Sequence, residues 1–458
     1  MDRMLYTPPR PTYPAEALSL PGFLSAVRTN ALLIWPDYAY ECPVFVSHSL
    51  GRAQMLLNAP EAIHRVLVEN PANYRRTPAS IRILRPITGR GLLLSEGDDW
   101  KLQRRTIAPA MAPRVIPLLA RHMASTTRET IAALADRTGR PVNLLAAMQS
   151  TALEIAGRSM FSLEMRAFGP EMRTLLTHFG NTLGRPHLFD MVLPASVPTF
   201  RDLRRLAFQR RWMALIDKII DARLATDHDG APRDLFDLLR AARDPETGRG
   251  FSRTELRDQV ATMIVAGHET TAITLFWSFY LLANAPVVQE RIASEVCAVD
   301  LDPEGAAEAL SQLPYTRAVV SEVLRLYPPA FTLVRLATGH DRAGAIEIPA
   351  GAILMISPWV LHRHRRLWRD ADAFDPDRFM PGEPPPPRFA YLPFGAGPRV
   401  CVGAQFAIAE AVLALAAIIQ VFKVALEGEP RVVPRPVITT QPDSAPGFIL
   451  TARQRPSA

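Results

Sequence analysis

Residues Phe394–Gly403, with the sequence FGAGPRVCVG, constrain the fold of this chain more than any other segment. They contain three glycines and one proline, a composition that fits poorly in a helix interior or a central strand. It fits a tight loop whose backbone can come close to another group. Cys401 follows directly on that loop. The segment therefore predicts a cysteine that is presented by a closely packed turn.

The residues after Cys401 are strongly apolar and predict a helix over roughly Gly403–Val424. A cysteine at a helix N-terminus lies near free backbone N–H groups and the positive end of the helix dipole, and both favour its thiolate. A thiolate that ligates haem iron promotes O–O cleavage. A cysteine in ordinary surroundings is more often a small buried apolar residue.

Composition and charge limit the class of protein. The chain has 458 residues, 48% hydrophobic and 21% charged, and can bury a large core while enclosing a cofactor. Its net charge is +7, from 52 basic and 45 acidic residues, which is a modest surplus for a long chain. This distribution does not indicate nucleic-acid binding, and it suits an acidic protein partner. Because we find neither a repeat nor a flexible linker, we expect a single domain over residues 1–458.

The cysteines and the apolar segments bear on localisation. Cys42, Cys297 and Cys401 lie far apart and predict a reducing compartment. No apolar run near the N-terminus is long enough for a secretory signal, so we expect a cytoplasmic protein. Gln259–Ala283 has about the length of a membrane span, but an ionised Glu269 near its middle would be costly there. We expect a buried core helix and no membrane span, with a span as the alternative.

Local patterns predict mostly helices with a few short strands. We expect strands at Pro43–Val46 and Ala53–Leu57, followed by a helix that Asn58 caps and that extends to Glu69. Pro286 and Pro328 should end two later helices, Thr254–Asn284 and Leu313–Tyr327. A loop between helices is expected at Asp190–Thr199, a turn at Asp227–Gly230 and an exposed turn at Pro384–Pro387.

Three more motifs place polar residues at fixed spacing. Glu322 and Arg325 lie at i, i+3 on one expected helix, upstream of Pro376–Phe379 (PDRF). Ala266–Thr271 (AGHETT) breaks the pattern of a core helix with a glycine and two threonines, which marks a candidate site. Trp100–Arg104 reads WKLQR. Taken alone, these motifs are also explained by a surface ion pair, a helix kink and a solvated arginine.

Together with the Cys401 loop, these motifs resemble those of the cytochrome P450 superfamily, in their order and spacing. FxxGxRxCxG is similar to its haem-binding signature, AGHETT to its oxygen-activation motif, and EVLR, PDRF and WKLQR to its ExxR, PxRF and WxxxR elements. The resemblance extends from about Pro43 to the C-terminus. It implies a mainly α (α+β) fold, a helical prism with small β-sheets. Haem b would lie between the Thr254–Asn284 helix and the Cys401 loop.

The resemblance also implies a role for each motif residue. Cys401 would be the axial ligand of the iron, and Glu269 and Thr270 would relay protons to bound oxygen. His268 is not expected to be a ligand. A structural cluster would hold the segment before Cys401. Other residues would contact the haem, some of them as partners of its propionates. For Arg335 a solvated surface role stays open beside the propionate role. The structural cluster is Glu322, Arg325 and Arg378; the haem contacts are Trp100, Arg104, Ala266, Arg335, Phe394, Arg399 and Gly403.

The implied reaction is insertion of one oxygen atom from O2 into an apolar organic substrate. Electrons would come from NAD(P)H through a separate ferredoxin and ferredoxin reductase or a similar donor, which would dock near Lys101, Arg104 or Arg105. Alternatives are a haem-thiolate peroxygenase or isomerase and a non-catalytic haem-binding sensor. The resemblance places the substrate pocket between five apolar segments: Thr77–Leu94, Pro186–Val197, Val260–Ala266, Ala330–Val334 and Ile438–Phe448.

Overall fold

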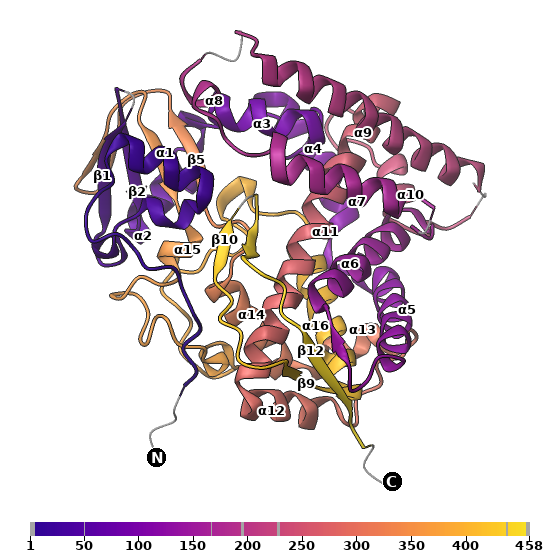
Figure 1. Ribbon diagram of the computed structural model, residues 1–458. Helices are drawn as coiled ribbons and strands as arrows, with labels where there is room; N and C mark the ends of the chain where they lie inside the picture. The colour runs from indigo at the N-terminus through magenta and orange to yellow at the C-terminus, as the bar shows by residue number, and fades with distance from the viewer. Residues whose placement is uncertain are drawn as a thin grey trace.

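The computed structural model describes residues 5–49, 51–165, 167–193, 197–226, 230–436 and 438–454. Helices form most of the molecule, and the largest sheet lies at one side, at the left of Figure 1. The helices are α1 Leu20–Thr29, α2 Pro60–His64, α3 Pro78–Thr88, α4 Gly97–Ile107, α5 Ile116–Ala135, α6 Leu144–Phe161, α7 Gly169–His178, α8 Leu188–Val192, α9 Phe200–Ala225, α10 Leu235–Ala241, α11 Arg253–Asn284, α12 Pro286–Val296, α13 Ala306–Ala309, α14 Pro314–Leu326, α15 Pro358–Leu361 and α16 Ala404–Val421. The strands are β1 Val44–Ser49, β2 Arg52–Leu57, β3 Tyr74–Arg75, β4 Pro141–Val142, β5 Leu333–Ala337, β6 Asp341–Ala343, β7 Ile346–Ile348, β8 Ile353–Ile356, β9 Phe422–Leu426, β10 Pro434–Pro436, β11 Thr440–Pro442 and β12 Phe448–Ala452.

Helix α11 runs through the middle of the helical part and organises the core (Figure 1). It begins with a capping box, in which Ser252 accepts a hydrogen bond from the Glu255 N–H and Glu255 accepts one from the Ser252 N–H. It ends two residues before Pro286, which cannot continue the helix. It packs against α6, α14 and α16, and residues 271–282 are all buried. The predicted core helix at Thr254–Asn284 is confirmed, with its first turn one residue earlier.

The largest sheet has the order β1-β2-β8-β5-β3. Strands β2 and β8 are parallel, and the other neighbours are antiparallel. Both predicted N-terminal strands are present, and β1 extends to Ser49, three residues beyond the predicted end. A second sheet, β4-β12-β9, holds the C-terminal strand, and β10 and β11 form a hairpin close to α11.

Three local predictions are wrong at their edges. Asn58 is not a helix cap: Pro60 occupies the first helical position, so Ala59 is the cap, and the Asn58 amide donates to the carbonyls of Ala39 and Cys42 at 2.8 and 3.0 Å. The helix itself divides into α2 and a π-helical turn, Arg65–Glu69. The helix after Cys401 ends at Val421, because Phe422–Leu426 pairs with β12 as a strand.

The predicted loop at Asp190–Thr199 is partly helical. A capping box between His187 and Asp190 starts the short helix α8, which ends at Val192. Pro194–Ser196 of this loop and Asp227–Asp229 of the predicted turn lie outside the described residues.

Within the described chain, α16 is the helix long and apolar enough by itself to cross a membrane, and 56% of its most apolar window is buried. Helix α11, which contains the candidate span Gln259–Ala283, passes the same test only together with α12, across a bend of 112°. Because α11 and α16 pack against one another, burial in the core accounts for the apolar character of both.

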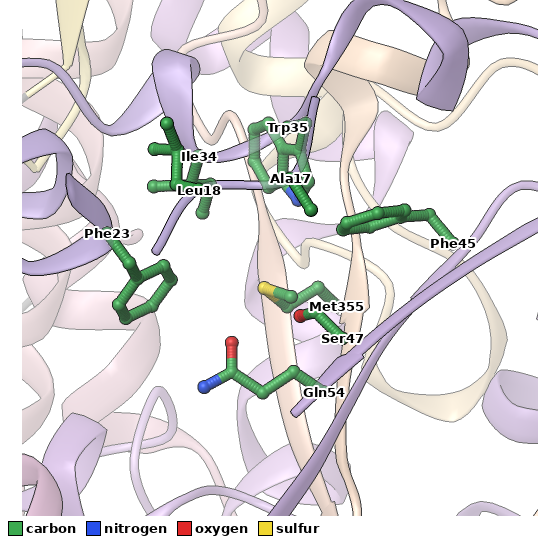
Figure 2. A pocket seen from close by; sticks show the side chains of 9 residues that line it. All are labelled: Ala17, Leu18, Phe23, Ile34, Trp35, Phe45, Ser47, Gln54 and Met355. Atoms are coloured by element: carbon green, nitrogen blue, oxygen red, sulfur yellow. The ribbon is translucent and has the colours of Figure 1, made fainter. Parts of the chain in front are cut away.

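A small pocket lies between α1 and the strands β1, β2 and β8 (Figure 2). Leu18, Phe23, Phe45 and Met355 supply much of its apolar lining, and the indole N–H of Trp35 has no hydrogen-bond partner among the described residues. No lining residue comes from α11 or from the Cys401 loop, so the pocket is separate from the site below.

Candidate functional site

The Cys401 loop is closely packed. Gly395 and Gly397 both have a φ of +71°, and a Cβ at Gly397 would lie 2.0 Å from the carbonyl oxygen of Leu67. A side chain at that position is therefore excluded by the conformation and by the neighbouring backbone. The Cys401 N–H donates to the Phe394 carbonyl at 2.9 Å. The loop thus closes on itself and fixes the direction of the cysteine.

The surroundings of Cys401 act on its thiol in opposite directions. Burial raises the pKa of the Cys401 thiol, and a hydrogen bond from the Gly403 backbone and the charge of Arg104 lower it. The side chain is nevertheless exposed, so a ligand can reach the sulfur. Cys401 lies ahead of α16, whose N-cap is Gly403, so the expected position near the helix N-terminus is correct to within two residues.

Cationic side chains gather near the cysteine loop. Arg399 stacks on Trp100 with 4.5 Å between its guanidinium carbon and the ring centre, and it donates to Glu96 at 2.6 Å. Arg76 also pairs with Glu96, at 3.2 Å. Burial and the charge of Arg76 lower the pKa of Arg399 to about 10. The pKa of Arg335 is also lowered to about 10, by burial and by the charges of Arg76 and Arg399.

These cations exceed the anions around them. The Arg335 guanidinium donates to the Val334 carbonyl at 3.0 Å, and Arg104 has no hydrogen bond or ion pair within the described residues. Burial also lowers the pKa of Arg104. Glu96 is the carboxylate that pairs with both Arg76 and Arg399. Because this group of arginines carries more positive charge than Glu96 balances, it suits a ligand that has carboxylates of its own.

The Ala266–Thr271 segment lies on α11. The Thr270 hydroxyl donates to the Ala266 carbonyl at 2.6 Å, and a Cβ at Gly267 would meet no atom within 4 Å. Ala266 is exposed, so this turn of the helix faces open space. One residue on, Thr271 donates to Glu410 of α16 at 3.2 Å. The segment is therefore fixed to the helix that follows Cys401.

Glu269 and His268 point to different neighbours. Burial raises the pKa of the Glu269 carboxyl, and hydrogen bonds from the side chains of Gln441 and Thr439 lower it. His268 Nε2 lies 3.0 Å from the Gln149 carbonyl on α6, and burial lowers the pKa of His268 to about 4. The imidazole is therefore neutral and bound away from the Thr270 side of the helix, which agrees with the expectation that it is no ligand.

Glu322, Arg325 and Arg378 come together behind the cysteine loop. Arg325 makes a two-pronged ion pair with Glu322 at 2.7 and 2.8 Å and donates to the carbonyls of His362, Ala371 and Ala373. Arg378 Nε lies 3.6 Å from Glu322. Glu322 and Arg325 have no exposed surface, so their charges are balanced within the cluster.

His362 links this cluster to the cysteine loop. Its Nδ1 lies 3.2 Å from the Arg325 carbonyl, and its Nε2 accepts from the Leu392 N–H at 2.8 Å. Leu392 is two residues before Phe394, where the loop begins. Burial and the charge of Arg325 lower the pKa of His362 to about 3, so the ring is neutral and can accept.

Some of the predicted pocket walls contact one another. Arg82 of α3 donates to the carbonyls of Phe189 and Val197, at 3.2 and 2.7 Å, and so joins the first two walls. The Thr262 hydroxyl of α11 donates to the Thr88 carbonyl at 3.2 Å, which joins the predicted wall Val260–Ala266 to the wall Thr77–Leu94.

The predicted docking residues have partners of their own. Arg105 makes ion pairs with Asp244 at 2.9 Å and with Glu246 at 2.9 Å, and the Asp244 side chain is fully buried. Lys101 pairs with Asp98 at 3.0 Å but is 60% exposed. Arg105 is thus a structural residue in this geometry, and Lys101 is the accessible cation of α4.

Comparison with known proteins identifies the family. The Cytochrome P450 family profile matches residues 37–445. Cyclooctatin synthase of Streptomyces melanosporofaciens is 35% identical over 78% of this chain and 78% of that protein. Cyclooctat-9-en-7-ol 5-monooxygenase of the same organism is 32% identical over 78% of this chain and 77% of that protein. The haem domain of cytochrome P450DA has the same fold, with a TM-score of 0.83, 24% identity and 99% coverage of both chains.

These matches place the chain among the haem-dependent oxidoreductases. It belongs to the cytochrome P450 family, and it is a monooxygenase that uses haem and dioxygen. The predicted fold class, a helical prism with small sheets, is confirmed. The residues present fit haem: a reachable cysteine sulfur, an open helix turn at Gly267, and two half-buried arginines, Arg104 and Arg335, with no carboxylate partner among the described residues.

Sequence reasoning missed four residues of this region. Arg76 and Glu96 surround Arg399, His362 supports the loop, and Gln441 binds Glu269. None belongs to a motif, and each meets its partner across 20 or more residues of sequence. Only the apolar stretch around His362 hinted at its burial.

Proposed function

We propose that this protein inserts one oxygen atom into an apolar cyclic alkene or alkenol of the terpenoid kind, with the Cys401 sulfur as the axial ligand of its haem. The observation that carries the proposal is the position of Cys401. Its sulfur is reachable, its loop is closed by the Phe394 carbonyl, and α16 behind it is bonded to the Ala266–Thr271 turn through Glu410 and Thr271.

Four side chains would hold the propionates of the haem. Arg104 and Arg335 have no carboxylate partner in the part of the chain that the structure describes, and Arg399, stacked on Trp100, completes the set. Phe394, Ala266 and Gly403 would contact the ring, where small residues and a flat aromatic side chain permit close approach. When bound, the haem supplies the activation of dioxygen.

Glu269 and Thr270 would move the protons that the reaction consumes. Burial raises the pKa of the Glu269 carboxyl, which favours the protonated form that a general acid needs. The Thr270 hydroxyl, fixed by the Ala266 carbonyl, keeps a lone pair free to accept and pass on a proton. A peroxygenase or isomerase does not need this pair, so its presence favours the monooxygenase cycle with external electrons.

The substrate class rests on the apolar walls and on the relatives. The names of two relatives refer to cyclooctatin and to cyclooctat-9-en-7-ol, an unsaturated alcohol. The wall segments Val260–Ala266 and Ala330–Val334 are mainly apolar and contain no charged residue. A hydrocarbon-rich molecule with few hydroxyl groups suits them.

The remaining parts of the proposal concern partners and location. We infer that residues 1–458 act as a single cytoplasmic domain that takes NAD(P)H electrons from a separate ferredoxin and ferredoxin reductase. The net charge of +7 supports an acidic donor. Burial of α11 and α16 supports the absence of a membrane span.

The decisive experiment is the absorption spectrum of the reduced, carbonmonoxy protein. Thiolate ligation gives the long-wavelength Soret band of this class, and Cys401→Ala should abolish it. An unchanged band in that variant would refute the assignment. A cyclic alkenol such as cyclooctat-9-en-7-ol should then shift the ferric Soret band on binding, and product should require NAD(P)H with the donor proteins. Product formed with peroxide alone would favour the peroxygenase.

A further inference from the structure

The Glu269 carboxylate is bonded to the C-terminal hairpin and not to Thr270. The Gln441 side-chain amide, at the second position of β11, donates to Glu269 Oε1. Successive residues of an α-helix point about 100° apart, and the Thr270 hydroxyl is already bonded to the Ala266 carbonyl. No ion pair of Glu269 with a basic side chain occurs in the described part of the chain. Gln441 is therefore the principal polar partner of this acid.

The hairpin is itself firmly attached at the neighbouring residue. The Thr440 hydroxyl donates to the Pro328 carbonyl at 2.6 Å, and its N–H donates to the Pro329 carbonyl at 3.1 Å. The Thr440 carbonyl accepts from the indole N–H of Trp277 on α11 at 2.8 Å. Because Trp277 lies two turns beyond Glu269 on the same helix, the position of Gln441 relative to Glu269 is set by the core.

We propose that Gln441 is a positioning residue for proton transfer, which holds the Glu269 carboxylate on the hairpin side of α11. This inference rests on the proposed role of Glu269 as the acid of the relay. An amide N–H bonds more strongly to an ionised carboxylate than to a neutral carboxyl. Gln441 thus holds the side chain while it is ionised and weakens its hold when Glu269 takes up a proton.

The hairpin also belongs to one predicted wall of the substrate pocket, Ile438–Phe448. Ile438, three residues before Gln441, lies so close to Gly184 that a Cβ there would be 2.9 Å from Ile438 Cδ1. The same short segment therefore contacts Gly184, at the end of the π-helical turn Phe179–Leu183, on one side and the relay acid on the other.

Infrared titration of the carboxyl group tests the proposal on purified, haem-loaded ferric protein and needs no substrate. The C=O band of protonated Glu269 is assigned by its loss in Glu269→Gln. In Gln441→Met, which keeps the size of the side chain but removes the donor, we expect the pKa of Glu269 to rise by about one to two units. In Gln441→Glu, a second carboxyl should raise it further.

Arg435→Gln is the matched control. Arg435 is the β10 residue opposite Gln441 and donates to the Thr29 carbonyl, so this change perturbs the hairpin without touching Glu269. The carboxyl band should titrate as in the wild type. A band in Gln441→Met that titrates at the wild-type pH would overturn the proposal.

A second readout is the hydrogen peroxide released per NAD(P)H, measured against pH with cyclooctat-9-en-7-ol and the donor proteins. Gln441→Met should move the pH profile upward with an unchanged KM, whereas a loss of fold alone would lower activity at every pH. If Glu269→Gln keeps the wild-type ratio, the relay assignment fails, and the infrared titration still decides whether Gln441 holds the carboxylate.

Discussion

Thr271 of α11 donates a hydrogen bond to Glu410 of α16 over 3.2 Å, at the contact between the two helices that flank the proposed haem site. Burial raises the pKa of Glu410 to about 8, and the bond from Thr271 only partly offsets this rise. At neutral pH the carboxyl is therefore largely protonated inside the core. The pair fixes the two helices to one another without a buried charge.

This pair predicts that stability falls as the pH rises toward about 8. Between the ordinary pKa of a glutamate and about 8, the folded protein binds more protons than the unfolded chain, so the free energy of unfolding falls as pH rises through that window. The fall should amount to a few kcal/mol, since each pKa unit corresponds to about 1.4 kcal/mol. Urea unfolding of the wild type at pH 6 and at pH 9 measures it.

Glu410→Gln serves as the comparison. The amide cannot ionise and still accepts from Thr271, so the difference in stability between the two pH values should shrink. The variant should be the more stable protein at pH 9. If both proteins show the same pH dependence, Glu410 does not titrate in this window.

Glu322→Ala should yield protein that loses haem. It leaves the Arg325 guanidinium buried without its counter-ion, which costs about 3–5 kcal/mol, and frees the segment that His362 ties to Leu392. The ratio of Soret to protein absorbance and the urea midpoint are the measurements. Glu347→Ala removes an exposed pair with Arg342 and should cost less than about 1 kcal/mol. Full haem loading in Glu322→Ala would contradict the structural role.

The motifs could be predicted from sequence because each is local. FGAGPRVCVG, AGHETT and EVLR carry their spacing within ten residues, and the fold only has to place them. The contacts that complete the site are not local. Gln441 reaches Glu269 across 172 positions, and Arg399 reaches Glu96 across 303. Neither pairing has a signature in one sequence.

The errors have the same origin. Asn58 has the residue type of a helix cap, but its amide is used by the carbonyls of Ala39 and Cys42, which tertiary packing brings near. Arg105 was expected to face a partner because it lies on a charged helix. It is bonded to Asp244, 139 positions away, whose carboxylate would otherwise be buried without a partner. A charged side chain is assigned to solvent or to structure only by its three-dimensional neighbours.

Thr270→Ala should uncouple oxygen consumption from product formation. The helix keeps its backbone bonds, but the hydroxyl that the Ala266 carbonyl orients is lost. We expect product per NAD(P)H to fall on the order of tenfold, at the lower end of the effects of losing a proton-transfer group. Thr270→Ser keeps the hydroxyl and should retain most of the coupling. An unchanged ratio in Thr270→Ala, at an unchanged overall rate, would show that Thr270 is not the relay.

Lys101→Glu should slow electron transfer from an acidic donor. Lys101 is exposed on α4, the helix that also carries Trp100 and Arg104, and its surface pair with Asp98 contributes little stability. Weak redox encounters depend on charge for orientation and on-rate, and salt screens this effect over about 8–10 Å. Stopped-flow reduction by a ferredoxin should therefore slow by about 3- to 10-fold at low salt in the variant, with a flatter dependence on salt.

Lys423→Glu supplies the same change of charge at a different place. Lys423 is exposed on β9, at the opposite end of the molecule from α4 (Figure 1). Arg105→Glu is unsuitable, because it would set a carboxylate against buried Asp244 and confound docking with loss of stability. If the donor docks at α4, Lys423→Glu should keep the wild-type rate and salt dependence while Lys101→Glu does not. If the two variants are reduced at equal rates at every salt concentration, the change in net charge alone explains the slower reduction of Lys101→Glu. The donor then docks somewhere other than α4.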